Sequence, residues 1–205
     1  MLKKISFFIL CFVVLSNSMM SETYRIPTDL QEDVGIFEKQ YEVNPTDNTR
    51  FDLAMAYAYT GQIIKGWKLL KKVSPEYAEV VVDMQSKLVK QEPEDWKHHF
   101  KLAFGQFFKG DKEIAQKSFL KVLELDPKNV WAMGYYALLE GEKGENSSAI
   151  TWCKKALEIE PNATGIHFLK AEGHRRQGDF MKAIGHMMIV GRLTTEENIE
   201  LPKEL

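Results

Sequence analysis

Cysteine is scarce in this sequence. The chain of 205 residues carries two, Cys11 and Cys153. Cys11 lies in an apolar N-terminal segment, so a chain that loses this segment keeps one thiol and has no partner for an internal disulfide. This excludes the small secreted folds that disulfides hold together. The stability of the protein must therefore come from packing.

An excess of charge of either sign is also missing. The chain has 27 Lys and Arg against 29 Asp and Glu, a formal net charge of −2, and its basic residues are scattered rather than gathered in an arm. A surface that holds nucleic acid needs such clustering. We therefore expect no nucleic-acid partner.

Motifs of catalysis and metal binding are lacking as well. The sequence has no phosphate-binding glycine motif, no HExxH pair and no nucleophile elbow. His167 and His174 can share one helix face, but they are two turns apart and need further ligands to chelate a metal. We therefore expect no catalytic residue, no metal site, no cofactor and no enzyme activity.

The longest hydrophobic run stands at the N-terminus. Lys3 and Lys4 precede an unbroken apolar run at residues 5–15, and small and polar residues follow it. The run is too short to cross a bilayer as a helix, which takes about 20 residues. This layout predicts a signal peptide at residues 1–21 and an exported protein, periplasmic or secreted, that meets a membrane only through this transient segment. The alternatives are an uncleaved anchor and a buried N-terminal helix.

A 34-residue repeat dominates the rest of the chain. Gly110, Gly144 and Gly178 are each 34 residues apart, and the alanines five residues after them keep the same interval. Pro127 and Pro161 are also 34 apart, and each closes one copy. A proline ends a helix and opens a turn, so each copy is predicted to be two helices joined at the glycine.

This unit resembles the tetratricopeptide repeat family, which also has small residues at the positions of Ala54, Ala103, Ala137 and Ala171. One helix pair cannot bury both of its faces, so the copies must stack. The resemblance therefore implies an all-α, right-handed helical-repeat solenoid whose concave side is lined by the first helix of each unit. The first copy departs from the pattern, because Gly66 stands where the others have alanine.

The spacing of the copies predicts the organisation of the chain. Residues 76–92 show helical periodicity and interrupt the repeat, so an inserted helix is expected there. The predicted segments are a signal peptide (1–21), an N-terminal segment with a half-repeat helix (22–46), repeat 1 (47–75), the inserted helix (76–92), repeat 2 (93–129), repeat 3 (130–163), repeat 4 (164–193) and a C-terminal tail (194–205).

The family resemblance assigns a set of side chains to the concave groove, most of them aromatic. They are Phe51, Met55, Tyr59, Phe100, Phe104, Phe108, Trp131, Tyr135, Leu138, Phe168, Arg175 and Arg176. Such a surface suits an apolar peptide or an amphipathic helix. This predicts a non-catalytic scaffold or adaptor that binds a protein or peptide. A groove filled by the chain's own helix, at 29–43 or 76–91, is the other reading.

The last repeat is more apolar on its outward stripe than the internal ones. Met181, Met188 and Ile189 stand where the internal copies are largely polar. A terminal repeat is expected to be polar outside, since it faces solvent. This stripe is therefore predicted to be covered, either by the tail at 194–205 or by a second subunit. The alternative function is a self-associating subunit of the cell envelope, a homodimer through its last helix.

Overall fold

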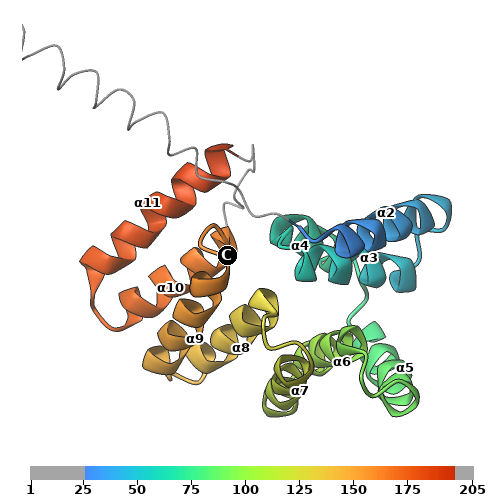
Figure 1. Cartoon of the computed structure of the whole chain (residues 1–205). Coiled ribbons are helices and arrows are strands. Elements are labelled where there is room, and N and C mark those ends of the chain that lie inside the picture. Colours follow the sequence, from blue (N-terminus) through green and yellow to red (C-terminus); the bar gives the residue numbers. More distant parts are fainter. Residues whose placement is uncertain (1–25, 197–205) are drawn as a thin grey trace, which may run out of the picture.

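The computed structural model describes residues 26–196, and within that range it contains ten helices and no strand (Figure 1). The predicted all-α helical-repeat fold is confirmed. The predicted signal peptide and the end of the predicted tail lie outside the described residues. None of the helices in residues 26–196 combines the length and the hydropathy that crossing a bilayer requires.

The helices follow one another with short turns. Their bounds are α2 (Thr28–Val43), α3 (Asp47–Tyr59), α4 (Ile63–Leu70), α5 (Tyr77–Gln91), α6 (Trp96–Lys109), α7 (Lys112–Leu125), α8 (Val130–Glu142), α9 (Asn146–Ile159), α10 (Thr164–Arg176) and α11 (Phe180–Glu196). Helix α5 lies in the segment where the sequence predicts an inserted helix. Residues 194–196, assigned to the tail from the sequence, form the last turn of α11.

Local signals fix where the helices begin and end. The Asp95 side chain accepts a hydrogen bond from the Lys97 backbone N–H at the start of α6, and Asn129 does the same for Ala132 in α8. Side-chain caps of this kind satisfy backbone donors that have no partner in the first helical turn. The repeating loop glycines adopt φ values between 79° and 96°, a left-handed conformation that glycine adopts most readily.

The helices from α5 onward stack in order. α6 pairs with α7, α8 with α9 and α10 with α11, while α5 packs against α6. Each second helix also carries the first helix of the next pair, since α7 packs on α8 and α9 on α10. Small residues permit this closeness: Ala103, Ala115 and Ala156 are completely buried.

The unit α2–α4 does not simply extend this row. Figure 1 shows it beside α5–α7, with α4 directed toward the middle of the molecule. Helix α3 contacts α8, and a Cβ atom added to Gly165 in α10 would lie 3.5 Å from the Ile63 side chain at the start of α4. The Trp131 ring of α8 lies against Gly61, in the turn between α3 and α4. The first repeat is thus folded across the concave side of the later ones.

Candidate protein-interaction site

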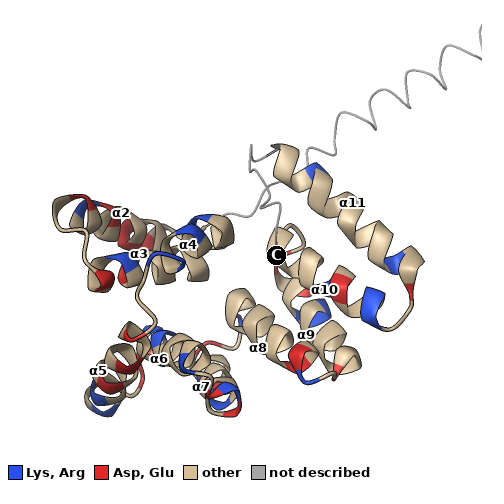
Figure 2. Cartoon of the chain, turned by 180° about the vertical axis from the view of Figure 1, so that it is seen from behind, with Lys and Arg blue, Asp and Glu red and all other residues tan. Residues whose placement is uncertain are grey.

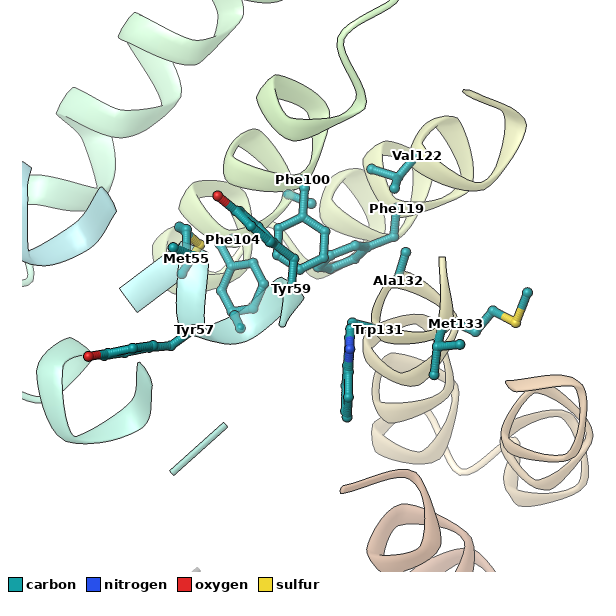
Figure 3. Close-up of a cluster of buried hydrophobic side chains, with 14 of the residues drawn as sticks. Met55, Tyr57, Tyr59, Phe100, Phe104, Phe119, Val122, Trp131, Ala132 and Met133 are labelled. Atoms are coloured by element: carbon teal, nitrogen blue, oxygen red, sulfur yellow. The ribbon is translucent and has the colours of Figure 1, made fainter. Parts of the chain in front are cut away.

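Most of the predicted groove residues lie in the hydrophobic core. Figure 3 shows Met55 and Tyr59 of α3 gathered with Phe100 and Phe104 of α6. Met55 and Phe100 have no exposed surface, and Phe104 is 6% exposed. Phe51 and Trp131 are buried as well, and Tyr135 is half-buried against the same core. In this structure these residues pack inside the protein rather than line an open groove.

The physical reason is that α3 covers the inward face of α6. The Tyr59 ring meets the Phe100 ring edge-on, with the centroids 5.8 Å apart. Phe104 meets Tyr135 in the same geometry at 4.7 Å. Edge-to-face contacts at these distances are favourable between aromatic rings. The groove is therefore filled by the chain itself, mainly through α3 with α2 beside it, while the helix at 76–91 contributes the contact of Tyr77 with Phe51.

Ion pairs fix the position of α2 and α3 against α6. Lys97 of α6 pairs with Asp33 of α2, and Lys101 pairs with Asp52 of α3 at 2.5 Å. The Tyr59 hydroxyl donates a hydrogen bond to Asp33 at 3.2 Å, and burial raises the pKa of Tyr59 well above its usual range. A partly buried pair with its hydrogen bonds satisfied specifies orientation more than it adds stability.

The open remainder of the groove is small. Phe108 is 41% exposed, and Leu138 and Phe168 are half-buried. Leu138 and Arg176 line a cavity of about 30 Å³ between α8, α9 and α10, which has room for one water molecule and not for a partner's side chain. A partner can therefore contact this end of the groove only at the protein surface and cannot insert a side chain.

The basic pair at this end is already neutralised in part. Arg175 and Arg176 are exposed, and both donate hydrogen bonds of 2.7 Å to the Glu172 carboxylate. The hydrogen bond from Arg175 is the largest influence that lowers the pKa of Glu172, to about 2. The carboxylate is therefore charged at neutral pH and competes with any acidic partner for these guanidinium groups.

The largest gathering of exposed apolar side chains lies on α11. Met181 is 79% exposed and Met188 is 71% exposed, whereas Ile189, predicted to join them, is half-buried. Sequence reasoning missed three neighbours on the same face: Phe180, Ile184 and Met187 are also exposed. We call Phe180, Met181, Ile184, Met187 and Met188 the α11 face. Figure 2 shows that α11 carries few charges, mainly near its ends.

Other chemistry is sparse among residues 26–196. The Cys153 thiol is buried, and burial raises its pKa to about 12, so it stays protonated and unreactive. Glu92, Asp95 and His98 bring three potential ligand atoms within 4.8 Å, a cluster that sequence reasoning did not find. Glu92 is exposed and His98 lies 3.5 Å from it, which is the geometry of a surface ion pair when the histidine is protonated.

Comparison with known proteins identifies the repeat. Residues 101–129 match the family model of the tetratricopeptide repeat. A DnaJ homolog subfamily C member 7 homolog from Schizosaccharomyces pombe is 36% identical over 77 residues, or 35% of this chain. Residues 101–129 are a tetratricopeptide repeat. The chain spans only 16% of the length of that curated relative, so the match covers a repeat segment and not the whole of the other protein.

Solved structures agree on the helical-repeat fold of the chain. A crystal structure of MamA superposes with a TM-score of 0.54 at 15% identity, covering 83% of this chain and 91% of MamA. MamA from Desulfovibrio magneticus RS-1 gives a TM-score of 0.55 at 14% identity, covering 84% and 89%. At such low identity the likeness shows the fold alone. The repeat at residues 101–129 and the shared fold support a protein-interaction scaffold.

The repeat register explains why the α11 face is open. Ile184 and Met187 occupy the positions of Gln116 and Phe119 in α7, which are buried beneath α8: Phe119 stacks on Tyr135. The same positions in α9 are covered by α10. Within the described residues no following helix packs on α11 in this way. Ile184 and Met187 of the α11 face therefore stand at stacking positions that are exposed to solvent.

Proposed function

We propose that this protein is an exported, non-catalytic scaffold that assembles through the α11 face. The observation that carries the proposal is the exposure of five large apolar side chains on one face of α11. Two of them, Ile184 and Met187, stand where the internal repeats seat a helix. Contiguous apolar patches on a repeat protein's end face are typical of interaction sites. The filled groove supports the same choice, since the aromatic residues assigned to it pack within the chain. Export, to the periplasm or beyond it, is supported by the layout of residues 1–21.

The occupant we propose for the α11 face is a second copy of this chain. At about 200 Å² for a fully exposed large side chain, the five residues offer roughly 600 Å² per copy. Two copies would bury roughly 1,200 Å², the lower bound for a stable specific interface. The stripe is also self-complementary about Ile184, because in an antiparallel pair Phe180 meets Met188 of the other copy. A two-fold dimer of this kind is the commonest symmetric assembly.

The test is the mass of the protein in solution. We expect the full chain to be dimeric in sedimentation equilibrium at about 100 µM, and Met188→Glu to weaken the dimer at least tenfold, since each copy would bury a carboxylate at the interface. Leu120→Glu is the matched control, because Leu120 holds the same repeat position on α7 and is 36% exposed. This variant should stay dimeric.

Two outcomes would contradict the dimer. One is a Met188→Glu protein that associates as tightly as the wild type. The other is a wild-type monomer that dimerises only after residues 197–205 are deleted, which would make the chain's own tail the cover of the α11 face.

A second candidate is binding of an apolar peptide at the open end of the groove, which the exposure of Phe108 favours. Capture of amphipathic helical peptides from a displayed library by the wild type and by Met188→Glu, but not by Phe108→Glu, would support this site. Loss of capture with Met188→Glu instead would assign the peptides to α11.

A further inference from the structure

Three histidines meet in the seam between α10 and α11, the two helices of the last repeat. His167 and His174 come from α10 and are buried, and His186 of α11 is half-buried. The Nδ1 atoms of His167 and His186 lie 2.9 Å apart. The rings of His174 and His186 are stacked, with their planes 5° apart and their centroids 5.9 Å apart. The sequence places His186 in this seam only when the 34-residue period is used to align α11 with the second helices of the earlier repeats.

Hydrogen bonding defines where the protons sit. The His167 Nε2 atom lies 2.8 Å from the Pro161 carbonyl oxygen, which can only accept, so this nitrogen carries the hydrogen. In a neutral ring the Nδ1 atom of His167 then has a free lone pair, and the Nδ1–H of His186 donates to it. The Nδ1 atom of His174 is buried with no hydrogen-bond partner. This arrangement of hydrogen bonds fits three neutral imidazole rings in the seam.

The surrounding charges oppose an added proton. Lys170 of α10 and Lys182 and Arg192 of α11 act on the three rings as cations. Asp179, in the turn between the helices, acts as the acid, 4.0 Å from the Nδ1 atom of His174, and it also pairs with Lys182 at 2.7 Å. Asp179 favours a proton on His174, but burial of that ring outweighs the carboxylate. His167 and His186 meet positive charge from Lys170, and His167 also from Arg192.

Burial and these cations shift the titration of the seam. Burial is the main cause that lowers the pKa of His167 and of His174 below the ordinary value of 6.5, and it lowers the pKa of His186 to about 4. The folded protein thus binds fewer protons than the unfolded chain between pH 6.5 and 4. The stabilisation of the seam is complete above pH 6.5 and is lost as the pH falls toward 4.

We propose that the α10–α11 seam is a proton-sensitive latch that releases α11 at acidic pH. Among the helices of residues 26–196, α10 is the one with which α11 makes extensive contact, so opening this seam frees α11 without unfolding the stack behind it. The same helix carries the α11 face. Release of α11 from α10 would displace the α11 face and dissociate the dimer. This consequence rests on the proposed function, whereas the latch itself does not.

Repeat 2 supplies an internal control for the latch. His99 of α6 stands 68 residues before His167. Its Nε2 atom lies 2.9 Å from the Pro93 carbonyl oxygen, which is the same contact that His167 makes with the Pro161 carbonyl oxygen. The positions of His174 and His186 are taken there by Gln106 and Ser118, which share a hydrogen bond of 2.7 Å. The α6–α7 seam therefore has the same architecture with a single histidine and no second imidazole.

The test is hydrogen exchange of the full chain read by mass spectrometry. After correction for intrinsic exchange, residues 180–196 should lose about tenfold in protection between about pH 7.5 and pH 5, while residues 112–125 keep theirs. His186→Gln should remove most of this loss, since the glutamine amide can donate to His167 and cannot be protonated. His99→Gln should leave the pH dependence of α11 as in the wild type.

The latch is overturned if α7 and α11 lose protection together, or if His186→Gln keeps the full pH dependence. Sedimentation at the same pH values separates this proposal from the dimer. A monomer at pH 7.5 whose α11 opens in acid would disprove the dimer and support the latch. A dimer whose α11 stays protected at pH 5 would do the reverse.

Discussion

At the scale of single residues, two phenylalanines one turn apart differ in burial. Phe104 and Phe108 both lie on the groove side of α6 in the family pattern. Phe104 is covered by the packed rings of Phe119 and Tyr135, whereas Phe108 is 41% exposed and meets Phe104 at 6.2 Å. Residue type cannot separate them, because the difference lies in which neighbouring helix reaches each ring.

This contrast predicts different effects on stability. Phe104→Ala should lower the free energy of unfolding by about 3–5 kcal/mol, since it leaves a cavity in a close-packed core. Phe108→Ala should cost about 1 kcal/mol or less, because the ring is already partly in water. Urea unfolding followed by circular dichroism measures both. Equal losses would mean that Phe108 is as well packed as Phe104.

At the scale of the helix, Gly66 shows why the first repeat departs from the alanine pattern. A Cβ atom on Gly66 of α4 would lie 2.9 Å from the backbone oxygen of Ala54 in α3. A backbone oxygen cannot swing aside as a flexible side chain can, so α3 and α4 would have to separate. The glycine is therefore a packing requirement of this helix pair.

Substitution by alanine tests this requirement. Alanine favours a helix over glycine by about 1 kcal/mol, so a gain would be expected from propensity alone. We predict instead that Gly66→Ala destabilises the protein by about 1–3 kcal/mol. Gly35→Ala in α2 is the control, because nothing lies within 4 Å of its added Cβ, and it should be stabilising. Thermal unfolding compares the two, and a stabilised Gly66→Ala protein would refute the close approach.

At the scale of the whole molecule, the decisive feature is the closure of repeat 1 onto the later repeats. Trp131 is 4% exposed, and its ring is wedged against Gly61, where a Cβ atom would collide with it. Gly165 of α10 also lies 3.5 Å from this ring, measured to an added Cβ. One side chain thus joins the first, third and fourth repeats.

Removing this ring should loosen the closure before it unfolds the stack. We predict that Trp131→Ala costs about 3–5 kcal/mol and makes the α4–α5 connection the first site of limited proteolysis. Ile159→Ala, at a 42% exposed position on α9, is a control that should leave the digestion pattern unchanged. Proteolysis that begins in α9–α11 in the Trp131→Ala protein would argue against this role of the ring.

The sequence by itself determined the helices, their turns and their stacking order. Caps, loop glycines and the 34-residue period act between neighbours in the chain, so they can be read without a structure. The apolar stripe of α11 was also visible in Met181 and Met188. The tertiary structure decided that the groove is filled rather than open, because the placement of α2–α4 depends on the inserted α5 and on rotations summed over several repeats. It also decided the meeting of His167, His174 and His186, since their contact depends on how the two helices turn against each other.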